Sequence, residues 1–272
     1  MKKLVLANQK GGVGKSAIAT QFAHYLHHQG LRVLVVDFDH QQNTSRPLKL
    51  HAGVVTADLS ASAVLEAPGP HSVPDAGFVL ISGDDRLSAI ERQADQHNAF
   101  VNRFHSALKA WDNFDVCIID TNPNPDIRYA AALICADYVL APIQLNQEAI
   151  IGISALLGHT RYGINRIAAT VNPSLKLLGI LPNLVEHTPF QKENLKALVG
   201  KFGGRLLSRQ SDAGVSYGYI FKRTAIAEAQ AAGTFLADMD KTSARETWRE
   251  VEPVFEMIAQ AMDVAPVNGV AA

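Results

Sequence analysis

Cysteine is scarce in this sequence, and its scarcity excludes two kinds of protein. The 272 residues contain only two cysteines, Cys117 and Cys135, which lie in apolar segments without C-x-x-C spacing. Two such residues cannot form a disulfide framework, and they are a poor fit to the ligand set of an iron–sulfur cluster. We therefore expect buried thiols in a reducing compartment.

Long apolar runs are also absent, and the net charge is close to zero. No apolar stretch approaches the roughly 20 residues of a membrane-spanning helix. We expect no signal peptide, because the first apolar run leads directly into a glycine-rich loop. The formal net charge is −1, so bulk charge argues neither for nor against nucleic-acid binding. With 47% hydrophobic and 19% charged residues, the composition is typical of a globular protein, and we expect a cytoplasmic location.

Strand-like apolar runs alternate with helical patterns along the chain. The strand-like runs cover residues 2–7, 31–37, 77–82, 114–120, 137–143 and 175–185. The helical patterns cover residues 16–29, 84–94, 98–111, 146–162, 189–202, 224–232 and 242–262. This alternation predicts an α/β fold with a doubly wound, mostly parallel sheet flanked by helices. No linker is visible, so we expect one domain over residues 1–263 and a disordered tail over 264–272.

The segment NQKGGVGKS, residues 8–16, separates the first strand-like run from the first helical pattern. It nearly fits the phosphate-loop pattern G-x-x-x-x-G-K-[ST], but Gln9 occupies the first glycine position and Lys10 follows it. The backbone N–H groups of such a loop bind phosphates, helped by the positive end of the next helix. Lys15 is expected to reach the β- and γ-phosphates, and Ser16 to ligate Mg²⁺. The predicted nucleotide-binding residues of the loop are Gly11, Gly12, Val13, Gly14, Lys15, Ser16 and Ala17.

Aspartates stand at the ends of two strand-like runs. Asp120 ends the run over 114–120, and we predict that it holds Mg²⁺ through water. Asp37 and Asp39 end the run over 31–37, where an acid can orient the attacking water. For Asp37, a turn-capping role is an equal alternative to a place in a metal site with Ser16 and Asp120.

Together these segments resemble the ParA/MinD family of deviant Walker A ATPases, and most of all ParA-type plasmid and chromosome partition ATPases. KGGVGKS, residues 10–16, matches the family loop K-G-G-x-G-K-[ST] at every fixed position. DFDHQ, residues 37–41, resembles the motif D-x-D-P-Q, and IIDTNP, residues 118–123, resembles I-I-D-x-P-P. Residues 136–153, 175–198 and 222–235 are also similar in order and spacing, so that the resemblance covers residues 1–262.

The resemblance implies a cytoplasmic ATPase of weak intrinsic activity with ATP and Mg²⁺ as cofactors. In the family, the additional lysine, here Lys10, reaches across a nucleotide-sandwich homodimer to the partner's ATP. Asp39 corresponds to the hydrolytic aspartate, so that Lys10, Lys15 and Asp39 are the predicted catalytic residues. In the family, the adenine base lies near the end of a strand, which corresponds here to the segment ILPN, residues 180–183. Pro182 and Asn183 are therefore predicted base contacts, although Asn183 is equally suited to capping a turn.

Two positions depart from the family pattern. His40 replaces the proline of the D-x-D-P-Q motif, and Asn122 replaces the first proline of the I-I-D-x-P-P segment. Both lie in segments that correspond to the family's switch regions. Loss of a proline relaxes the backbone, so we expect the hydrolysis rate and its stimulation by a partner to differ from those of better-matched relatives.

Residues 187–223 carry seven Lys or Arg side chains against two acidic ones. Such a patch can neutralise DNA phosphates, and a dimer would present it twice. Partition ATPases bind non-specific double-stranded DNA through this region, whereas the alternative is an ordinary solvated helix face. The predicted DNA-binding residues are Lys192, Lys196, Arg205, Lys222 and Arg223. A ParB-like centromere-binding protein or a cargo adaptor is the expected stimulating partner, and the nucleoid is the expected site of action.

Three functions other than DNA partition are alternatives for an ATPase of this kind. The same cycle can position a protein cargo, such as a microcompartment or a chemotaxis cluster, and the sequence does not separate this from DNA segregation. A MinD-like membrane switch is disfavoured because the chain after Trp248 has one arginine against four acids, which anionic lipid repels. A cobyrinate-synthase-like amidating enzyme would usually bring a further catalytic domain, for which these residues leave no room.

Overall fold

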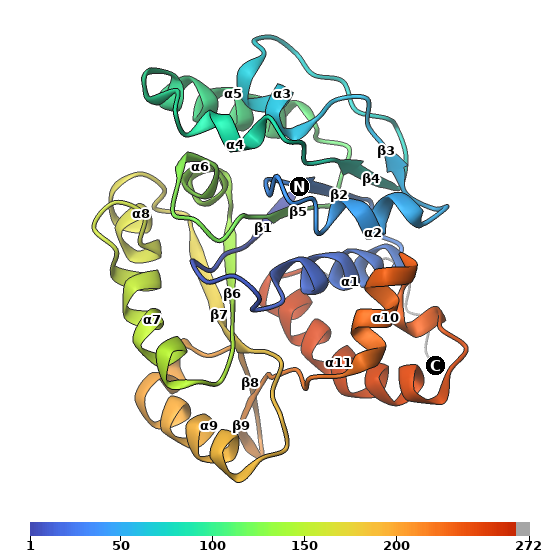
Figure 1. Ribbon diagram of the computed structural model, residues 1–272, viewed down its shortest axis with the longest axis vertical. Helices are drawn as coiled ribbons and strands as arrows, with labels where there is room; N and C mark the ends of the chain where they lie inside the picture. The colour runs from blue at the N-terminus through green and yellow to red at the C-terminus, as the bar shows by residue number, and fades with distance from the viewer. Residues whose placement is uncertain (265–272) are drawn as a thin grey trace.

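The computed structural model describes residues 1–264, apart from the side chains of residues 147 and 149–151. A seven-stranded sheet forms its centre, in the order β3-β4-β2-β5-β1-β6-β7, and every neighbouring pair is parallel (Figure 1). Its strands are β1 (Lys2–Leu6), β2 (Val33–Asp37), β3 (Val55–Thr56), β4 (Phe78–Ile81), β5 (Val116–Asp120), β6 (Tyr138–Ile143) and β7 (Lys176–Pro182). The predicted α/β class with a doubly wound parallel sheet is confirmed.

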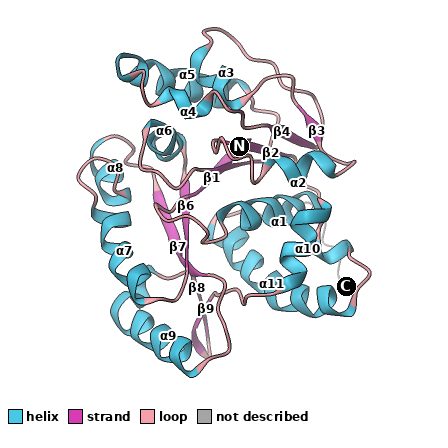
Figure 2. Cartoon of the chain, in the orientation of Figure 1, coloured by secondary structure: helices cyan, strands magenta, loops and turns pink. Residues whose placement is uncertain are grey.

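Helices cover both faces of the sheet (Figures 1 and 2). One face carries α1 (Lys15–His28), α2 (Ser45–Leu50), α10 (Thr224–Ala232) and α11 (Thr242–Ala261). The other carries α3 (Ala61–Glu66), α4 (Leu87–Ile90), α5 (His97–Ala110), α6 (Ile127–Cys135), α7 (Gln147–Gly158) and α8 (Ile164–Thr170). Beyond β7 lie α9 (Pro189–Phe202) and an antiparallel hairpin of β8 (Ser208–Ser211) and β9 (Gly214–Tyr217). Short 3-10 helices span Ala94–Gln96, Gly203–Arg205 and Leu236–Asp238.

The inner strands are apolar throughout because both of their faces are covered. All five residues of β2 are buried. Val33 and Val35 pack in the core beneath α1 and α11, whereas Leu34 and Val36 pack in the core beneath α5 and α6. A strand buried on both sides loses the alternation of polar and apolar residues, which explains why such continuous runs predicted parallel strands correctly.

The carboxyl ends of the central strands meet at one edge of the sheet. β1 lies between β5 and β6, with Leu6 opposite Asp120. β2 pairs with the other side of β5, so that Asp37 also lies opposite Asp120. Chain connections leave β1 and β6 toward opposite edges of the sheet, and such a switch point is where ligands bind in open α/β sheets. The glycine-rich loop after β1 lies at this point.

Several elements differ from the sequence prediction. The helix predicted over 84–94 is wrong, since α4 is a single turn. The helix predicted over 146–162 ends at Gly158, and α8 starts after Gly163, where a Cβ atom would lie 2.6 Å from the His159 backbone nitrogen. The expected tail disorder concerns residues 264–272, which lie outside the described residues except for Val264.

The pattern also missed α2, α3, α6, α8, β3 and the β8–β9 hairpin. Helix α6 shows why, because eight of its nine residues are buried and no polar stripe marks its period. Among residues 1–264, no helix is long and apolar enough to cross a bilayer.

Candidate nucleotide-binding site

The loop after β1 turns sharply into α1. Gly12 and Gly14 have φ angles of 73° and 87°, which favour glycine, and Gly14 is the N-cap of α1. An added Cβ at Gly11 or Gly12 would meet nothing within 4 Å, so these residues border open space. The loop therefore forms an open cradle at the positive end of a 14-residue helix.

Three carboxamide side chains from distant segments hold this cradle. Asn8 donates from Nδ2 to the Pro142 carbonyl at 2.6 Å, and its Oδ1 accepts from the Lys10 backbone at 2.9 Å. Gln144, after β6, donates to the Gly12 carbonyl at 2.9 Å. Asn183, after β7, donates to the Val13 carbonyl at 2.8 Å. The Gly12 and Val13 carbonyls are thus held by side chains from other segments, whereas the Lys10 carbonyl accepts from Lys15 Nζ at 3.5 Å.

Lys15 is nearly buried, at 6% exposure, at the first position of α1. Burial lowers the pKa of its ammonium group, and the charges of Asp120 and Asp39 raise it in opposition. The structure therefore brings Lys15, Asp39 and Asp120 together electrostatically, from three segments of the chain. A buried lysine with carboxylates near it is suited to neutralising a phosphate that enters the cradle.

Asp120 is fully buried at the end of β5. Burial raises the pKa of its carboxyl group, and Lys15 is the largest influence that lowers it. Its Oδ2 accepts a 2.7 Å hydrogen bond from the Thr44 hydroxyl, while its Oδ1 has no hydrogen-bond partner among residues 1–264. An unpartnered buried carboxylate oxygen beside a phosphate loop fits the second coordination sphere of Mg²⁺, and the Ser16 hydroxyl supplies a hard oxygen ligand.

Asp37 is also fully buried, but its oxygens are satisfied from within the chain. Ser45 donates to Oδ2 from its hydroxyl at 2.6 Å and from its backbone at 2.9 Å, and the Asp39 backbone donates to Oδ1 at 3.0 Å. Burial and the neighbouring Asp120 raise the pKa of Asp37 to about 7. These contacts shape the turn between β2 and α2, which places Asp39 with only 5% exposure.

The Lys10 side chain is engaged by a neighbouring helix, α7. Its Nζ forms a 2.9 Å ion pair with Oε2 of Glu148 on α7, and both side chains remain accessible, at 39% and 84% exposure. The additional lysine is therefore held at the surface of the same chain, in an interaction of the kind that contributes at most about 1 kcal/mol.

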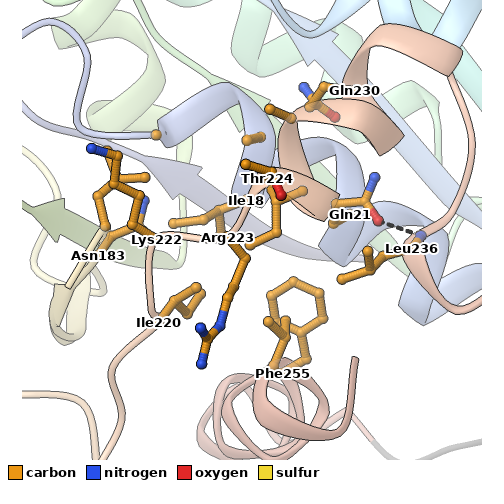
Figure 3. Close-up of a pocket in the computed structure, with 16 residues that line it drawn as sticks. Ile18, Gln21, Asn183, Ile220, Lys222, Arg223, Thr224, Gln230, Leu236 and Phe255 are labelled. Atoms are coloured by element: carbon orange, nitrogen blue, oxygen red, sulfur yellow. Dashed lines mark hydrogen bonds between the residues drawn. The ribbon is translucent and has the colours of Figure 1, made fainter. Parts of the chain in front are cut away.

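A cavity of about 450 Å³ adjoins the loop (Figure 3). Gly14, Ala17 and Asn183 line the end next to the cradle, and the remaining walls come from α1, α10, α11, Leu184, Leu236 and residues 220–224. Pro182 is buried in β7 and is not among the lining residues, so the structure brings only Asn183 of the predicted base contacts to this cavity. The amide nitrogen of Asn183 is already engaged by Val13.

The five predicted DNA-binding residues form two groups. Lys192 and Lys196 are exposed on α9, and Arg205, in the following 3-10 helix, donates to Asn165 Oδ1 at 3.4 Å. Lys222 instead pairs with Glu186 at 2.8 Å, and Arg223 pairs with both oxygens of Glu250 at 2.6 and 2.9 Å. These ion pairs compensate their charges, and both residues also line the cavity.

Sequence reasoning missed several residues that organise this site. Thr44 and Ser45 bond the two buried aspartates, Gln144 holds the loop, and Glu148 pairs with Lys10. The polar run HQQNTS after Asp39 was the available signal for the first two, because a run of polar residues directly after a buried strand has to be satisfied somewhere. Nothing in the sequence pattern marked Gln144 or Glu148.

Comparison with known proteins identifies the family. Residues 1–177 match the AAA domain family. Protein IncC of Escherichia coli is 33% identical over 97% of this chain and 71% of its own length. The chromosome-partitioning ATPase Soj of Thermus thermophilus is 30% identical over 89% of this chain and 90% of its own. The chain belongs to the ParA/MinD family of deviant Walker A ATPases.

Solved structures place this family member among P-loop proteins that bind nucleotides. A Cyanothece McdA variant in complex with ATP superimposes with a TM-score of 0.75 over 98% of both chains at 19% identity, which supports the fold. Cobyrinic acid a,c-diamide synthase from Mycobacterium smegmatis, with bound ADP and magnesium, gives 0.61 at 29% identity over 74% of this chain and 82% of its own. The family assignment supports nucleotide hydrolysis in general.

Proposed function

We propose that this chain is a ParA-type partition ATPase, in which Mg–ATP drives a nucleotide-sandwich homodimer that binds non-specific DNA. Hydrolysis, stimulated by a ParB-like or cargo-adaptor protein, then releases the DNA. The single observation that carries the proposal is the Lys10–Glu148 pair. It keeps the additional lysine accessible and engaged by α7, where a second protomer can use it.

Within one protomer, the roles follow from the contacts. The loop amides and Lys15 hold the triphosphate, and Ser16 and Asp120 hold Mg²⁺, which would neutralise charge on the β- and γ-phosphates. Asp39 is assigned the orientation of the attacking water. Because Asp37 already accepts three hydrogen bonds, we assign it the shaping of the β2–α2 turn rather than the metal. The cavity beside Asn183 is the proposed adenine site.

Dimerisation is proposed to bring the partner's Lys10 to the γ-phosphate. A cation supplied in trans stabilises charge that develops in the transition state, as an arginine finger does. A single protomer lacks that cation, since its own Lys10 is paired with Glu148. Weak intrinsic hydrolysis follows, together with dissociation once the γ-phosphate is lost.

The DNA surface is assigned to α9 and the turn after it. Lys192 and Lys196 are four residues apart, so they share a helix face, and neither makes an ion pair among the described residues. Lys222 and Arg223 are engaged in ion pairs and line the cavity, which supports an adenine-side location for them instead. On this proposal the protein acts in the cytoplasm on nucleoid DNA, with a replicon or a protein assembly as cargo.

A membrane switch receives less support from the structure. The apolar face of α11 that a membrane would need is occupied, because Val251, Val254, Phe255 and Ile258 are buried in the core against α1. The helix has no free amphipathic face to offer among the described residues.

The test measures binding of a non-specific DNA duplex with ATP, with ADP and without nucleotide, at two salt concentrations. We expect salt-sensitive binding only with ATP, lost in Lys10→Ala. The double variant Lys192→Ala/Lys196→Ala should lower the salt slope of a dimer by as much as about 4. The charge-matched control Lys49→Ala/Lys109→Ala, with exposed lysines on α2 and α5, should keep the wild-type slope. Tight ATP binding without DNA affinity in any state contradicts the proposal and points to an ATPase that does not act on DNA, such as a metabolic one.

A further inference from the structure

The two prolines that this chain lacks have been replaced by side chains that lie at the same edge of the sheet. His40 follows β2 and Asn122 follows β5, and these strands pair with Asp37 opposite Asp120. Asn122 is fully buried and donates from Nδ2 to Asp126 Oδ2 at 2.8 Å. The two departures from the family pattern are therefore close in space as well as in the motif.

Arg128 connects these two segments from the first turn of α6. It is only 3% exposed, and Asp126, the N-cap of α6, is 6% exposed. The guanidinium donates from Nε to Asp126 Oδ2 at 3.0 Å and also from Nη2 to the same oxygen. A buried arginine and aspartate of this kind are stable only when paired, so the position of the guanidinium is well defined.

The remaining nitrogen of the guanidinium, Nη1, faces the loop after β2, which carries Asp39. Arg128 Nη1 lies 3.4 Å from His40 Nδ1, and His40 Nδ1 lies 3.4 Å from Asp39 Oδ1. Because arginine can only donate, Nδ1 of His40 accepts from Arg128 and cannot also hydrogen-bond Asp39 Oδ1, which is an acceptor too. The other ring nitrogen, Nε2, lies 2.8 Å from the Gln41 side-chain amide. A row of side-chain contacts, which we call the Arg128 bridge, thus runs through His40, Arg128, Asp126 and Asn122. Its His40 end is the chain neighbour of Asp39.

We infer that Arg128 is a positioning residue for the hydrolytic Asp39. The bridge restricts the two loops in the way that prolines at positions 40 and 122 would. This inference rests on the proposed role of Asp39 in ATP hydrolysis. Proline restricts the backbone directly, whereas the bridge fixes each loop to the other through side chains. The loops after β2 and β5 consequently move as one unit.

At the Asn122 end of the bridge, one buried hydrogen-bond acceptor is unsatisfied among the described residues. Asn122 Oδ1 is buried and has no hydrogen-bond partner among residues 1–264. Leaving such an acceptor unsatisfied costs about 1–3 kcal/mol. A water molecule that hydrogen-bonds there would satisfy this acceptor.

The substitution Arg128→Lys tests the bridge, because only the branched guanidinium can contact two side chains at once. Lysine keeps the positive charge beside Asp126, but its single nitrogen cannot contact Asp126 and His40 in the same geometry. Arg128→Lys therefore removes the bridge while it preserves the buried charge pair. Arg103→Lys is the matched control, because Arg103 is a half-buried arginine on α5 that donates to the Leu65 carbonyl at 3.1 Å, away from the site.

The first test is amide hydrogen exchange of the nucleotide-free proteins. Arg128→Lys should raise exchange several-fold in both residues 38–44 and residues 121–126, and Arg103→Lys should raise it in neither. An increase confined to α6, or no increase, overturns the bridge. This readout needs no ATPase activity, so it separates failure of the bridge from failure of the proposed function.

The second test measures single-turnover hydrolysis and ATP affinity. In the wild-type background, Arg128→Lys should lower the hydrolysis rate about 10-fold or more while the Kd for ATP changes less than about twofold. In a His40→Pro/Asn122→Pro background, the same substitution should change the rate less than about twofold, because proline then stiffens both loops. Equal losses in both backgrounds, or a parallel loss of ATP affinity, overturn the inference.

Discussion

Gly14 meets two separate demands at one position of the phosphate loop. Its φ angle of 87° lies in the left-handed region, and a Cβ atom there would be 2.1 Å from Asn183 Nδ2. That nitrogen cannot withdraw freely, since it holds the Val13 carbonyl. The residue therefore has to be glycine for reasons of backbone conformation and of packing.

We predict that Gly14→Ala lowers ATP affinity at least about 10-fold, since the strain of roughly 1–3 kcal/mol is relieved only by moving the loop. Isothermal titration with ATP and Mg²⁺ measures this. Gly200→Ala is the control, because a Cβ there meets nothing within 4 Å in the interior of α9. It should bind ATP normally and be slightly more stable. Unchanged affinity in Gly14→Ala would mean that the loop has a different shape in solution.

His24 is a buried histidine without a hydrogen bond at Nε2. It packs on α1 against the rings of His51, Phe78 and Phe235, with centroids 4.6–5.8 Å away. Burial lowers its pKa to about 3, with smaller contributions from His51, His28 and His27. It carries no metal partners, since the described residues contain no cluster of metal-ligating side chains.

The pKa of His24 predicts a stability loss in mild acid. Between about pH 3 and 6.5 the unfolded chain binds a proton that the folded chain does not, so stability falls as the pH falls. From pH 7 to pH 5 the expected loss is about 2 kcal/mol. In His24→Leu, the loss of unfolding free energy between pH 7 and pH 5 should be smaller than in the wild type by about 2 kcal/mol. Urea unfolding at both pH values measures this loss. His105→Leu, at an exposed position of α5, should lose as much as the wild type. Parallel losses in all three proteins would contradict the prediction.

At the scale of elements, helix α11 attaches the end of the described chain to the sheet. Phe255 is 1% exposed and packs edge-on against Phe22 of α1, with ring centroids 5.4 Å apart. Tyr25 and Trp248 surround the same ring. This apolar face is the one that a membrane-binding helix would have to expose.

We predict that Phe255→Ala lowers the free energy of unfolding by about 3–5 kcal/mol, through lost burial and the cavity left behind. Chemical denaturation without nucleotide measures this, with Gln260→Ala, at an exposed position of the same helix, as the control. A change below about 1 kcal/mol would show that α11 is detached in solution, and it would revive the membrane hypothesis.

At the scale of the whole molecule, the Lys10–Glu148 pair within one chain bears on the proposed homodimer. If Lys10 serves a partner's nucleotide, Glu148 competes for it within its own chain. An exposed ion pair contributes at most about 1 kcal/mol, so its removal can tighten association only modestly. The effect should also disappear at high salt.

Glu148→Gln is therefore predicted to strengthen the ATP-dependent dimer by up to about fivefold at low salt. Sedimentation analysis with ATP over a range of protein concentrations measures the dissociation constant. Lys10→Ala should abolish the dimer, and Glu148→Gln should not restore it in the double variant. A weaker dimer in Glu148→Gln would mean that Glu148 contributes to the interface itself.

The fold class, the glycine-rich turn into α1 and the family could all be predicted from the amino-acid sequence, because these depend on local patterns. Continuous apolar runs predicted the inner parallel strands, and the glycine-rich loop predicted the turn into α1. Helix α6 was beyond this reasoning, because a helix buried on all sides has no polar stripe. The β8–β9 hairpin, which is largely exposed, lacks the buried face on which the strand pattern depends.

Tertiary structure alone decided which residues act together. Asp37 and Asp120 carry equivalent sequence signals, yet three hydrogen bonds satisfy Asp37, whereas one oxygen of Asp120 stays unpartnered. Lys222 and Arg223 counted as free charges in the sequence and are paired in the fold. Arg128 contacts His40 from 88 positions away. Local composition sets how a segment folds, but charge compensation and burial depend on neighbours that only the folded chain brings together.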